Sequence, residues 1–542
     1  MAILNSNQQP IIGWRSLVVT QVVNAVDVDA QAFITAAAIT DLTQASAINT
    51  LVNDLKSAGV WTKMKALYPM VGGTASSHKW NLKDPRDLDA AYRLVFNGGG
   101  IHSSTGYAGN ASNAFADTKL SPFTALTNNN NHLSVYSNLE NTDPNGEYSL
   151  VAGALNATYT ERFDLLISYE NTTSYATNTN GSTQISYPES NKLGMYMQTR
   201  TSSNIFKLFK NNSIIGTNTG VNTSQLPNFN LFLGAHNAGG TTRYAYRRIA
   251  FASIGDGLSD TEATNFYTAV QKYQTSLGRH VGTPIVSDTD AQAFINAAVI
   301  TNATQANAIN TLVTDLKSAG VWTKMKALYP FVGGTATTHK FNLKDPRDLD
   351  IAYRLKFFGG GTHSSTGWKP NALNAYAELG TLNMNTISPI DYSFGIYSRT
   401  NESNGVFYDC GATNNVDTGW YSFNLRGGIN QLNWQSGSIA IISSSGSNTN
   451  SQGFYQAVAN SNNLTKIFKN GSLLITSTTT QTKTPFNQVM NIGRAVITTG
   501  GGYYSTREQG LFYISSGLSD SEIVSVRTAV YNYQNALGRL AE

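Results

Sequence analysis

The chain contains one sequence unit twice. Residues 55–69 read LKSAGVWTKMKALYP, and residues 316–330 are identical. Residues 81–89 recur without a difference as residues 342–350. A repeat of this length indicates two tandem copies of one structural unit. The 542 residues also exceed one ordinary domain, which has about 100 to 200 residues.

The match between the copies continues to the end of each. Residues 277–279 read Leu-Gly-Arg, and residues 537–539 repeat them. We therefore predict a first unit over residues 27–280 and a second unit over residues 281–542. Residues 1–26 have no counterpart in the repeat, so we treat them as a separate N-terminal segment.

Each unit is predicted to open and to close with a helix. Asp41 with Gln44 forms a capping box before apolar residues at helical spacing, and Ser259 with Glu262 does the same near the end of the unit. The second copy repeats both spacings. Residues 61–68 are interpreted as a further short helix.

The middle of each unit is predicted to consist of short strands. Leu133 and Val135 alternate with polar residues, and Asn470-Gly471 suits the type I′ turn of a β-hairpin. Many short strands separated by Gly, Asn and Ser turns are typical of a β-sandwich. The expected fold class is mainly β with flanking helices, twice in tandem.

Composition excludes several classes of protein. Charged residues make up 13% of the chain, about half of the usual share, and the formal net charge is +4. This balance is too weak for nucleic-acid binding by phosphate neutralisation. With 41% hydrophobic residues the chain is not disordered, and no apolar run is long enough for a membrane span.

Cys410 is the only cysteine, so no intramolecular disulfide and no cysteine metal cage can form. We expect it to be buried as a small hydrophobic residue. The first residues lack a basic region followed by an apolar core, so we predict no secretory signal. The protein is expected either to stay in a reducing cytoplasm or to leave by a route that needs no signal.

Two stretches carry a resemblance to a known family. Residues 66–75 (ALYPMVGGTA) and 81–87 (NLKDPRD) resemble tailed-bacteriophage virion proteins, and the endings of both copies are similar to the closing helix of the same modules. The hairpin at residues 468–471 (FKNG) followed by Ile492-Gly493 resembles the laminin-G pattern. The resemblance implies tail-fibre, tail-tip, collar or capsid-decoration proteins with concanavalin-A/laminin-G-like jelly-roll lectin domains.

An acidic cluster occurs in both copies. Its members are Asp84, Asp87 and Asp89 in the first copy and Asp345, Asp348 and Asp350 in the second. One interpretation is a turn held by ion pairs with Arg86 and Arg93. Another is a Ca²⁺ site, since calcium takes oxygen ligands. The Glu-x-Asp-x-x-Glu strand motif of concanavalin-like glycoside hydrolases is absent, so we predict no enzyme activity.

Aromatic and histidine side chains are the remaining candidates for a site. Trp368, Trp420 and Trp434 occur only in the second copy and are candidate glycan-binding residues, because sugars stack on aromatic faces; burial in the core is the alternative. Four histidines recur in pairs at the repeat shift, and we interpret them as turn or surface residues, with contact to a ligand as the alternative: His78, His102, His339 and His363.

The N-terminal segment contains the apolar, β-prone stretches Ile11-Ile12-Gly13-Trp14 and Leu17-Val18-Val19. It is predicted either to add a strand to a neighbouring subunit or to extend the first sandwich. We therefore expect binding to other virion proteins through this segment and homo-oligomerisation.

The sequence predicts a non-enzymatic phage virion protein, made in the bacterial cytoplasm, that displays two lectin-like domains for attachment to a host-surface glycan. One alternative is a capsid-decoration or tail-assembly component that binds only virion proteins. A polysaccharide depolymerase is the other alternative.

Overall fold

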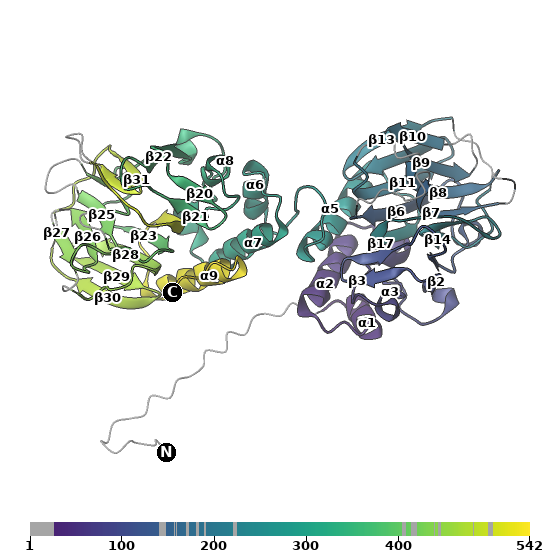
Figure 1. The fold of residues 1–542 in the computed structure, drawn as a ribbon, viewed down its shortest axis with the longest axis horizontal. Helices are drawn as coiled ribbons and strands as arrows, with labels where there is room; N and C mark the ends of the chain where they lie inside the picture. Colours follow the sequence, from purple (N-terminus) through teal and green to yellow (C-terminus); the bar gives the residue numbers. More distant parts are fainter. Residues whose placement is uncertain are drawn as a thin grey trace, which may run out of the picture.

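The computed structural model describes residues 26–139, 148–156, 158, 160–169, 173–179, 184–188, 191–220, 225–403, 408–413, 420–437, 439–442, 446–480, 482–496 and 502–542. The β-prone stretches of the N-terminal segment therefore lie outside the described residues. Figure 1 shows two halves, each with strands and a layer of helices. Among the described residues, no helix is both long and apolar enough to cross a lipid bilayer.

Each half begins and ends with helices in its sequence, and short helices lie between them. In the first half they are α1 (Val28–Ala36), α2 (Leu42–Ser57), α3 (Ala75–His78), α4 (Pro122–Ala125) and α5 (Asp260–Ser276). In the second they are α6 (Thr289–Ala297), α7 (Ala303–Ser318), α8 (Ala336–His339) and α9 (Asp520–Ala536). The long opening and closing helices were predicted from the apolar spacing, and both are confirmed.

The first half contains two sheets. One has the order β13-β12-β11-β6-β17-β4-β3, with β1 added on β17; the other has the order β10-β9-β8-β7-β14-β5-β2, with β15 and β16 at its side. The strands are β1 (Met64–Tyr68), β2 (Val95–Asn97), β3 (Ile101–Ser103), β4 (Gly106–Ala108), β5 (Phe115–Asp117), β6 (Asn131–Ser137), β7 (Tyr148–Leu155), β8 (Arg162–Tyr169), β9 (Thr173–Thr179), β10 (Gln184–Pro188), β11 (Gly194–Ser202), β12 (Ile205–Lys210), β13 (Ser213–Asn218), β14 (Phe232–Leu233), β15 (Ala235–Asn237), β16 (Thr241–Tyr244) and β17 (Arg248–Gly255).

The second half repeats this plan. Its sheets have the orders β20-β21-β34-β23-β28-β29-β30, with β18 on β34, and β19-β22-β31-β24-β25-β26-β27; β32 and β33 form a separate hairpin. The strands are β18 (Met325–Tyr329), β19 (Leu355–Phe358), β20 (Thr362–Ser364), β21 (Gly367–Lys369), β22 (Tyr376–Asn383), β23 (Tyr392–Ser398), β24 (Cys410–Thr413), β25 (Trp420–Asn424), β26 (Asn433–Gly437), β27 (Ile439–Ile442), β28 (Gly453–Ser461), β29 (Leu464–Lys469), β30 (Ser472–Ser477), β31 (Val489–Ile492), β32 (Arg494–Val496), β33 (Gly502–Tyr504) and β34 (Gln509–Ser515).

Each half has two cores. In the first half, Leu133 and Phe163 belong to a core between the two sheets, which makes the pair a β-sandwich. Leu51 and Phe266 belong to a second core between the helices and the sheet that contains β6. The helices therefore cover one sheet and not the other. The second half has the same two cores.

The predicted short helix at residues 61–68 is wrong. A single 3₁₀ turn, Trp61–Lys63, precedes β1, which pairs with β17. Met64 and Leu67 belong to the helix-side core, whereas Ala66 and Tyr68 belong to the sandwich core. A strand buried on both faces produces a dense apolar run, and in so short a segment this run resembles helical spacing.

The predicted capping boxes and hairpin turn described next are confirmed, with one exception. The reciprocal capping box of Ser259 and Glu262 is present. Asp41 caps α2 by accepting from the Gln44 amide, but the Gln44 side chain accepts from Gly72 N at 2.8 Å instead of returning to Asp41. At the β29–β30 hairpin both Asn470 and Gly471 have positive φ, as a type I′ turn requires.

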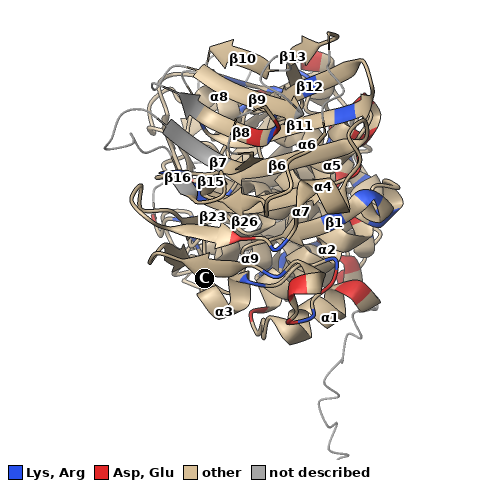
Figure 2. Cartoon of the chain, turned by 90° about the vertical axis from the view of Figure 1, so that its right-hand side faces the viewer, with Lys and Arg blue, Asp and Glu red and all other residues tan. Residues whose placement is uncertain are grey.

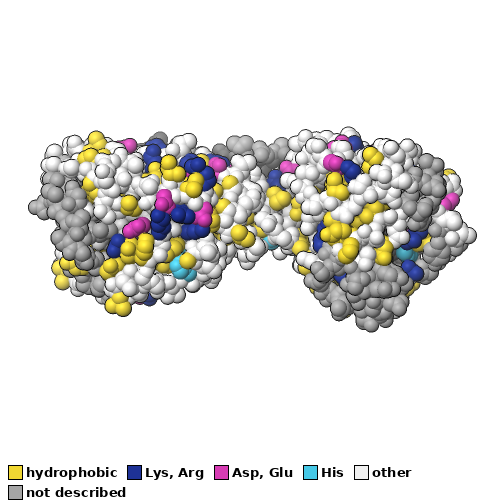
Figure 3. All heavy atoms as spheres, turned by 90° about the horizontal axis from the view of Figure 1, so that it is seen from above, with side chains coloured by type: hydrophobic (Ala, Val, Ile, Leu, Met, Phe, Trp, Pro, Cys, Tyr) yellow, Lys and Arg dark blue, Asp and Glu magenta, His cyan; other side chains and the backbone are white. Residues whose placement is uncertain are grey.

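Charged side chains are few and lie in small mixed groups. Figure 2 shows acidic and basic residues gathered near α1 and α2, while most of the strand surface carries neither charge. Figure 3 shows the same mixture on another face, where Lys, Arg, Asp and Glu lie side by side. This distribution follows from a chain with 13% charged residues whose carboxylates are used in local ion pairs.

Candidate functional site

The acidic clusters form ion-paired turns. In the first half Arg86 Nη2 lies 2.5 Å from Asp84, and Arg93 contacts both Asp87 (2.7 Å) and Asp89 (3.0 Å). The hydrogen bond from Arg86 lowers the pKa of Asp84, and hydrogen bonds from Lys79 and Arg93 lower the pKa of Asp87. The second half repeats the arrangement with Asp345, Asp348 and Asp350 paired to Arg347, Arg354, Lys340 and Lys356.

The Ca²⁺ interpretation of these clusters is therefore corrected. Their carboxylates already face cations, and the described part of the chain contains no group of three or more metal-ligating side chains. We expect excess EDTA, or millimolar Ca²⁺, to leave the melting temperature unchanged in differential scanning fluorimetry. A rise in melting temperature with Ca²⁺ that Asp87→Asn and Asp348→Asn abolish would restore the calcium site.

Two of the three candidate tryptophans are core residues. Trp368 and Trp434 are 0% exposed and belong to the sandwich core of the second half. Trp434 Nε1 donates to Tyr392 Oη at 3.3 Å, within that core. A ring without an exposed face cannot stack on a sugar, so the glycan-binding role predicted for these two residues is withdrawn.

Trp420 differs from the other two. Tyr421 and Phe423 on the same strand point into the core, so Trp420 points to the outer face of the sheet that the helices leave uncovered, where it is half-buried. Its ring centroid lies 6.3 Å from that of Tyr408, and the Tyr408 ring lies 5.9 Å from that of Tyr503. Tyr503 is 43% exposed. We call Tyr408, Trp420 and Tyr503 the Trp420 group.

Polar residues flank the Trp420 group on the same strands. Ser422 lies two residues beyond Trp420, and its Oγ donates to Gln435 Oε1 at 3.0 Å. This bond uses only the oxygen of the Gln435 amide, so its NH₂ group keeps donors for a ligand. Trp420 itself pairs with Gly437 on β26, and the Thr482 carbonyl and the Lys483 side chain pack against Gly437.

A second set of rings lies towards the other edge of this sheet, beside β19 and β22. Phe358 is 40% exposed and stacks on Tyr376 at 4.8 Å. The Arg494 guanidinium lies 3.1 Å from the centroid of the Tyr376 ring, and Tyr504 lies 6.2 Å from Tyr376. Arg494 also faces Glu378 at 3.8 Å, which balances its charge. Sequence reasoning missed these residues because they come from four separate strands.

The first half fills the equivalent place differently. The β7–β8 pair Ala152–Leu165 corresponds to the β24–β25 pair Cys410–Phe423, so Arg162 and Asp164 stand where Trp420 and Ser422 stand in the second half. Asp164 is 0% exposed, with Arg162 at 2.8 Å and His236 at 3.3 Å. Arg162, first among the favourable contacts, holds the pKa of Asp164 low despite burial. An ion pair, and not an aromatic ring, therefore occupies this place in the first half.

Two of the four repeated histidines are not surface residues as predicted, whereas His102 and His363 are half-buried. His78 and His339 are 1% and 2% exposed. His78 Nδ1 lies 2.9 Å from His102 Nδ1, and His339 makes the same contact with His363. Burial, helped by the neighbouring imidazole and a buried arginine, lowers the pKa of each buried histidine to about 3. Each pair joins the loop that follows the first strand of its half to another strand: the loop after β1 to β3, and the loop after β18 to β20.

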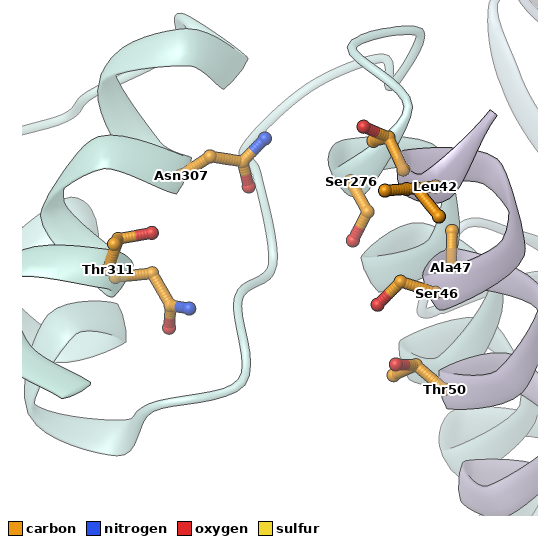
Figure 4. Close-up of a pocket in the computed structure, with 9 residues that line it drawn as sticks. Leu42, Ser46, Ala47, Thr50, Ser276, Asn307 and Thr311 are labelled. Atoms are coloured by element: carbon orange, nitrogen blue, oxygen red, sulfur yellow. The ribbon is translucent and has the colours of Figure 1, made fainter. Parts of the chain in front are cut away.

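A groove of about 430 Å³ lies between the two halves. In Figure 4, Asn307 and Thr311 of α7 face Leu42, Ser46 and Thr50 of α2 across it. The halves touch beside this groove, where Asn307 Nδ2 donates to the Thr275 carbonyl at 3.2 Å. Its lining consists of small neutral side chains, and we assign no function to it.

No family model matches the sequence, and no curated protein matches it. Among solved structures, domain 4 of AbnA, a GH43 extracellular arabinanase from Geobacillus stearothermophilus, in complex with arabinotriose, is 12% identical, with a TM-score of 0.29 over 38% of this chain and 98% of that domain. The botulinum neurotoxin serotype D binding domain (10% identical, TM-score 0.27, 38% and 52% covered) and the binding domain of Paraclostridial Mosquitocidal Protein 1 (14%, 0.28, 39% and 53%) are similar at the same level. The chain thus spans about half the length of these two toxin domains. Matches at these scores carry no argument about function.

Proposed function

We propose that this chain is a non-enzymatic virion protein of a tailed bacteriophage that binds a bacterial surface glycan through the Trp420 group. The observation that carries glycan binding is a pair of partly exposed rings, Trp420 and Tyr503, joined by the buried Tyr408 on the sheet face that the described helices leave uncovered. The virion part of the proposal is supported by the resemblance of residues 66–87 and of the closing helices.

The chemistry of the face suits a sugar. Sugars place apolar C–H faces against aromatic rings and direct hydroxyl groups to amides and hydroxyls at the rim. Trp420 and Tyr503 offer the rings, and Gln435 offers amide donors close to Ser422. The remaining rings, around Tyr376, extend the apolar area across the same sheet.

The first half serves as a scaffold in this proposal. Its equivalent face holds the buried Arg162–Asp164 ion pair, covered by His236, in place of an accessible ring. Each chain therefore has one glycan site. Binding by a single open site is weak, and several chains on one particle raise the overall affinity through multivalency.

The remaining parts of the proposal concern assembly. The chain is made in the bacterial cytoplasm, oligomerises, and joins other virion proteins through residues 1–26. Few charges on the strand surface suit a protein whose sandwiches meet neutral glycans or pack into a protein shell.

Glycan binding is tested with three alanine variants on an array of bacterial surface polysaccharides. Trp420→Ala and Tyr503→Ala are expected to lower the apparent affinity at least about fivefold each, because each removes a stacking surface. Phe123→Ala is the matched control, because Phe123 is 45% exposed but lies in the first half. It should bind like the unmodified chain.

Two other outcomes would redirect the assignment. Absence of binding to every polysaccharide, together with tight docking to purified virion particles lacking this protein, would identify an assembly component. Release of reducing sugar from host capsule would identify a depolymerase and overturn the non-enzymatic proposal.

A further inference from the structure

A pocket of about 540 Å³ lies where the two halves join. Its walls come from β12 to β13 and α5 of the first half, from residues 281–285 that connect the halves, and from α6 of the second half. We call residues 281–285 the strap and this cavity the strap pocket. We infer that the strap pocket binds a small, neutral, polyhydroxylated molecule, no larger than a disaccharide. This inference goes beyond the proposed function, because the strap pocket is separate from the Trp420 group.

Hydrogen bonds hold the walls of the strap pocket in place without a ligand. The Val281 amide donates to Tyr136 Oη at 2.6 Å, and Gln271 Nε2 donates to the Val281 carbonyl at 2.8 Å. On the other side, Gln292 Nε2 of α6 donates to the Pro284 carbonyl at 3.1 Å. The strap is therefore bonded to both halves. A preformed pocket loses little conformational freedom when a ligand enters.

The lining offers polar groups that are not used within the chain. Asn211 accepts from the Met195 amide at 2.9 Å, and Asn296 accepts from Gln292 Nε2 at 2.9 Å, each through its side-chain oxygen. Their NH₂ groups keep donors for a ligand. The Tyr267 hydroxyl has no hydrogen-bond partner among the described residues. Burial raises the pKa of Tyr267 to about 12, so this hydroxyl keeps its proton at neutral pH.

The chemistry of the lining indicates the ligand class. None of the described residues that line the strap pocket carries a charge, so an ionic ligand would lose hydration without meeting an opposite charge. Amide and phenol groups suit hydroxyl groups of a ligand. The partly buried Tyr267 ring, with Val281 and Ile285, gives apolar surface for its C–H groups. The volume lies within the range of about 300 to 1,000 Å³ that small-molecule pockets have.

The second half fills the equivalent place with an ion pair. The Leu-Gly-Arg endings of the two copies set the equivalence, so Arg527 of α9 and Glu542 stand where Tyr267 of α5 and Gly282 stand in the first half. Arg527 Nη2 donates to Glu542 Oε2 at 2.8 Å. The repeat thus has two versions of one place, and the version at the junction has an aromatic ring and a glycine instead of the ion pair.

The test is isothermal titration calorimetry of the full chain with glycerol, glucose, galactose, mannose, sucrose and maltose, and with glucuronate as the charged probe. We expect at least one neutral sugar to bind one site per chain, with a Kd below about 1 mM. Tyr267→Ala should weaken that binding at least about tenfold, and Tyr267→Phe, which keeps the ring, about threefold. Asn265→Ala is the matched control, since Asn265 is exposed on α5 and does not line the pocket.

The outcomes separate this inference from the proposed function. Failure of every neutral probe to bind, or binding that both Tyr267 variants leave unchanged, would overturn the strap pocket as a site. Glucuronate that binds more tightly than glucose would overturn the neutral ligand class. Binding that Trp420→Ala abolishes and Tyr267→Ala keeps would place the sugar at the Trp420 group, which would overturn this inference and leave the proposed function standing.

Discussion

Arg279→Ala is expected to lower the free energy of unfolding of the first half by about 3 to 5 kcal/mol. Arg279 is 5% exposed and donates to the carbonyls of Pro69 (2.6 Å), Met70 (2.7 Å) and Ala250 (2.9 Å). Alanine leaves these buried acceptors without donors and opens a cavity. Urea denaturation followed by fluorescence measures the change.

The repeat provides an internal replicate, and the surface provides a control. Arg539 makes the same contacts in the second half, with Pro330, Phe331 and Gly510, so Arg539→Ala should destabilise that half comparably. Arg86→Ala removes an exposed, ion-paired arginine and should leave the unfolding curve unchanged. Equal effects of Arg279→Ala and Arg86→Ala would show that the buried network contributes little.

Acid is expected to destabilise the protein well before its carboxylates are protonated. His78 and His339 have a pKa of about 3, and His132 has a pKa of about 4, in each case mainly because burial disfavours the imidazolium. In the unfolded chain a histidine titrates near 6.5. Below that pH the unfolded chain therefore binds more protons, and stability is lost progressively as the pH falls from 6.5 towards 3.

The size of the acid effect follows from the pKa shifts. One pKa unit corresponds to 1.36 kcal/mol, so each buried histidine of the two pairs contributes up to about 4 kcal/mol at the low end of that window. Thermal unfolding at pH 7.5, 6.0 and 4.5 should show a steadily falling melting temperature. His78→Gln with His339→Gln should flatten that dependence; an unchanged slope would show that the pairs are not its source.

Much of the fold could be predicted because the sequence signals for it are local. The capping residues Ser259 and Glu262, the helical stripe of α5 and the Asn470-Gly471 turn each act through neighbours a few residues away. Strand β1 could not be predicted this way, since its burial on both faces depends on α2 and β17, which are distant in sequence.

The candidate site was predictable only in part, for the same reason. The sequence gives no reason to separate Trp420 from Trp368 and Trp434, yet of the three only Trp420 points away from the core. Side chains alternate between the two faces of a strand, so the register of each strand decides which face its tryptophan takes. Tyr408 and Tyr503 join Trp420 through pairing across the sheet and hairpin. The histidine pairs could be noticed in the sequence because they recur in both copies, but nothing in the sequence indicated that one histidine of each pair is buried.

Hydrogen–deuterium exchange of the full chain, with and without a polysaccharide that binds on the array, tests most directly whether the Trp420 group is the glycan site. If it is, we expect slower exchange in β24, β25 and β33 of the second half on binding, and no change in β8 and β15 of the first half. We also expect Trp420→Ala to abolish the difference. Protection on β8 and β15, or at the groove between the halves, would contradict this assignment.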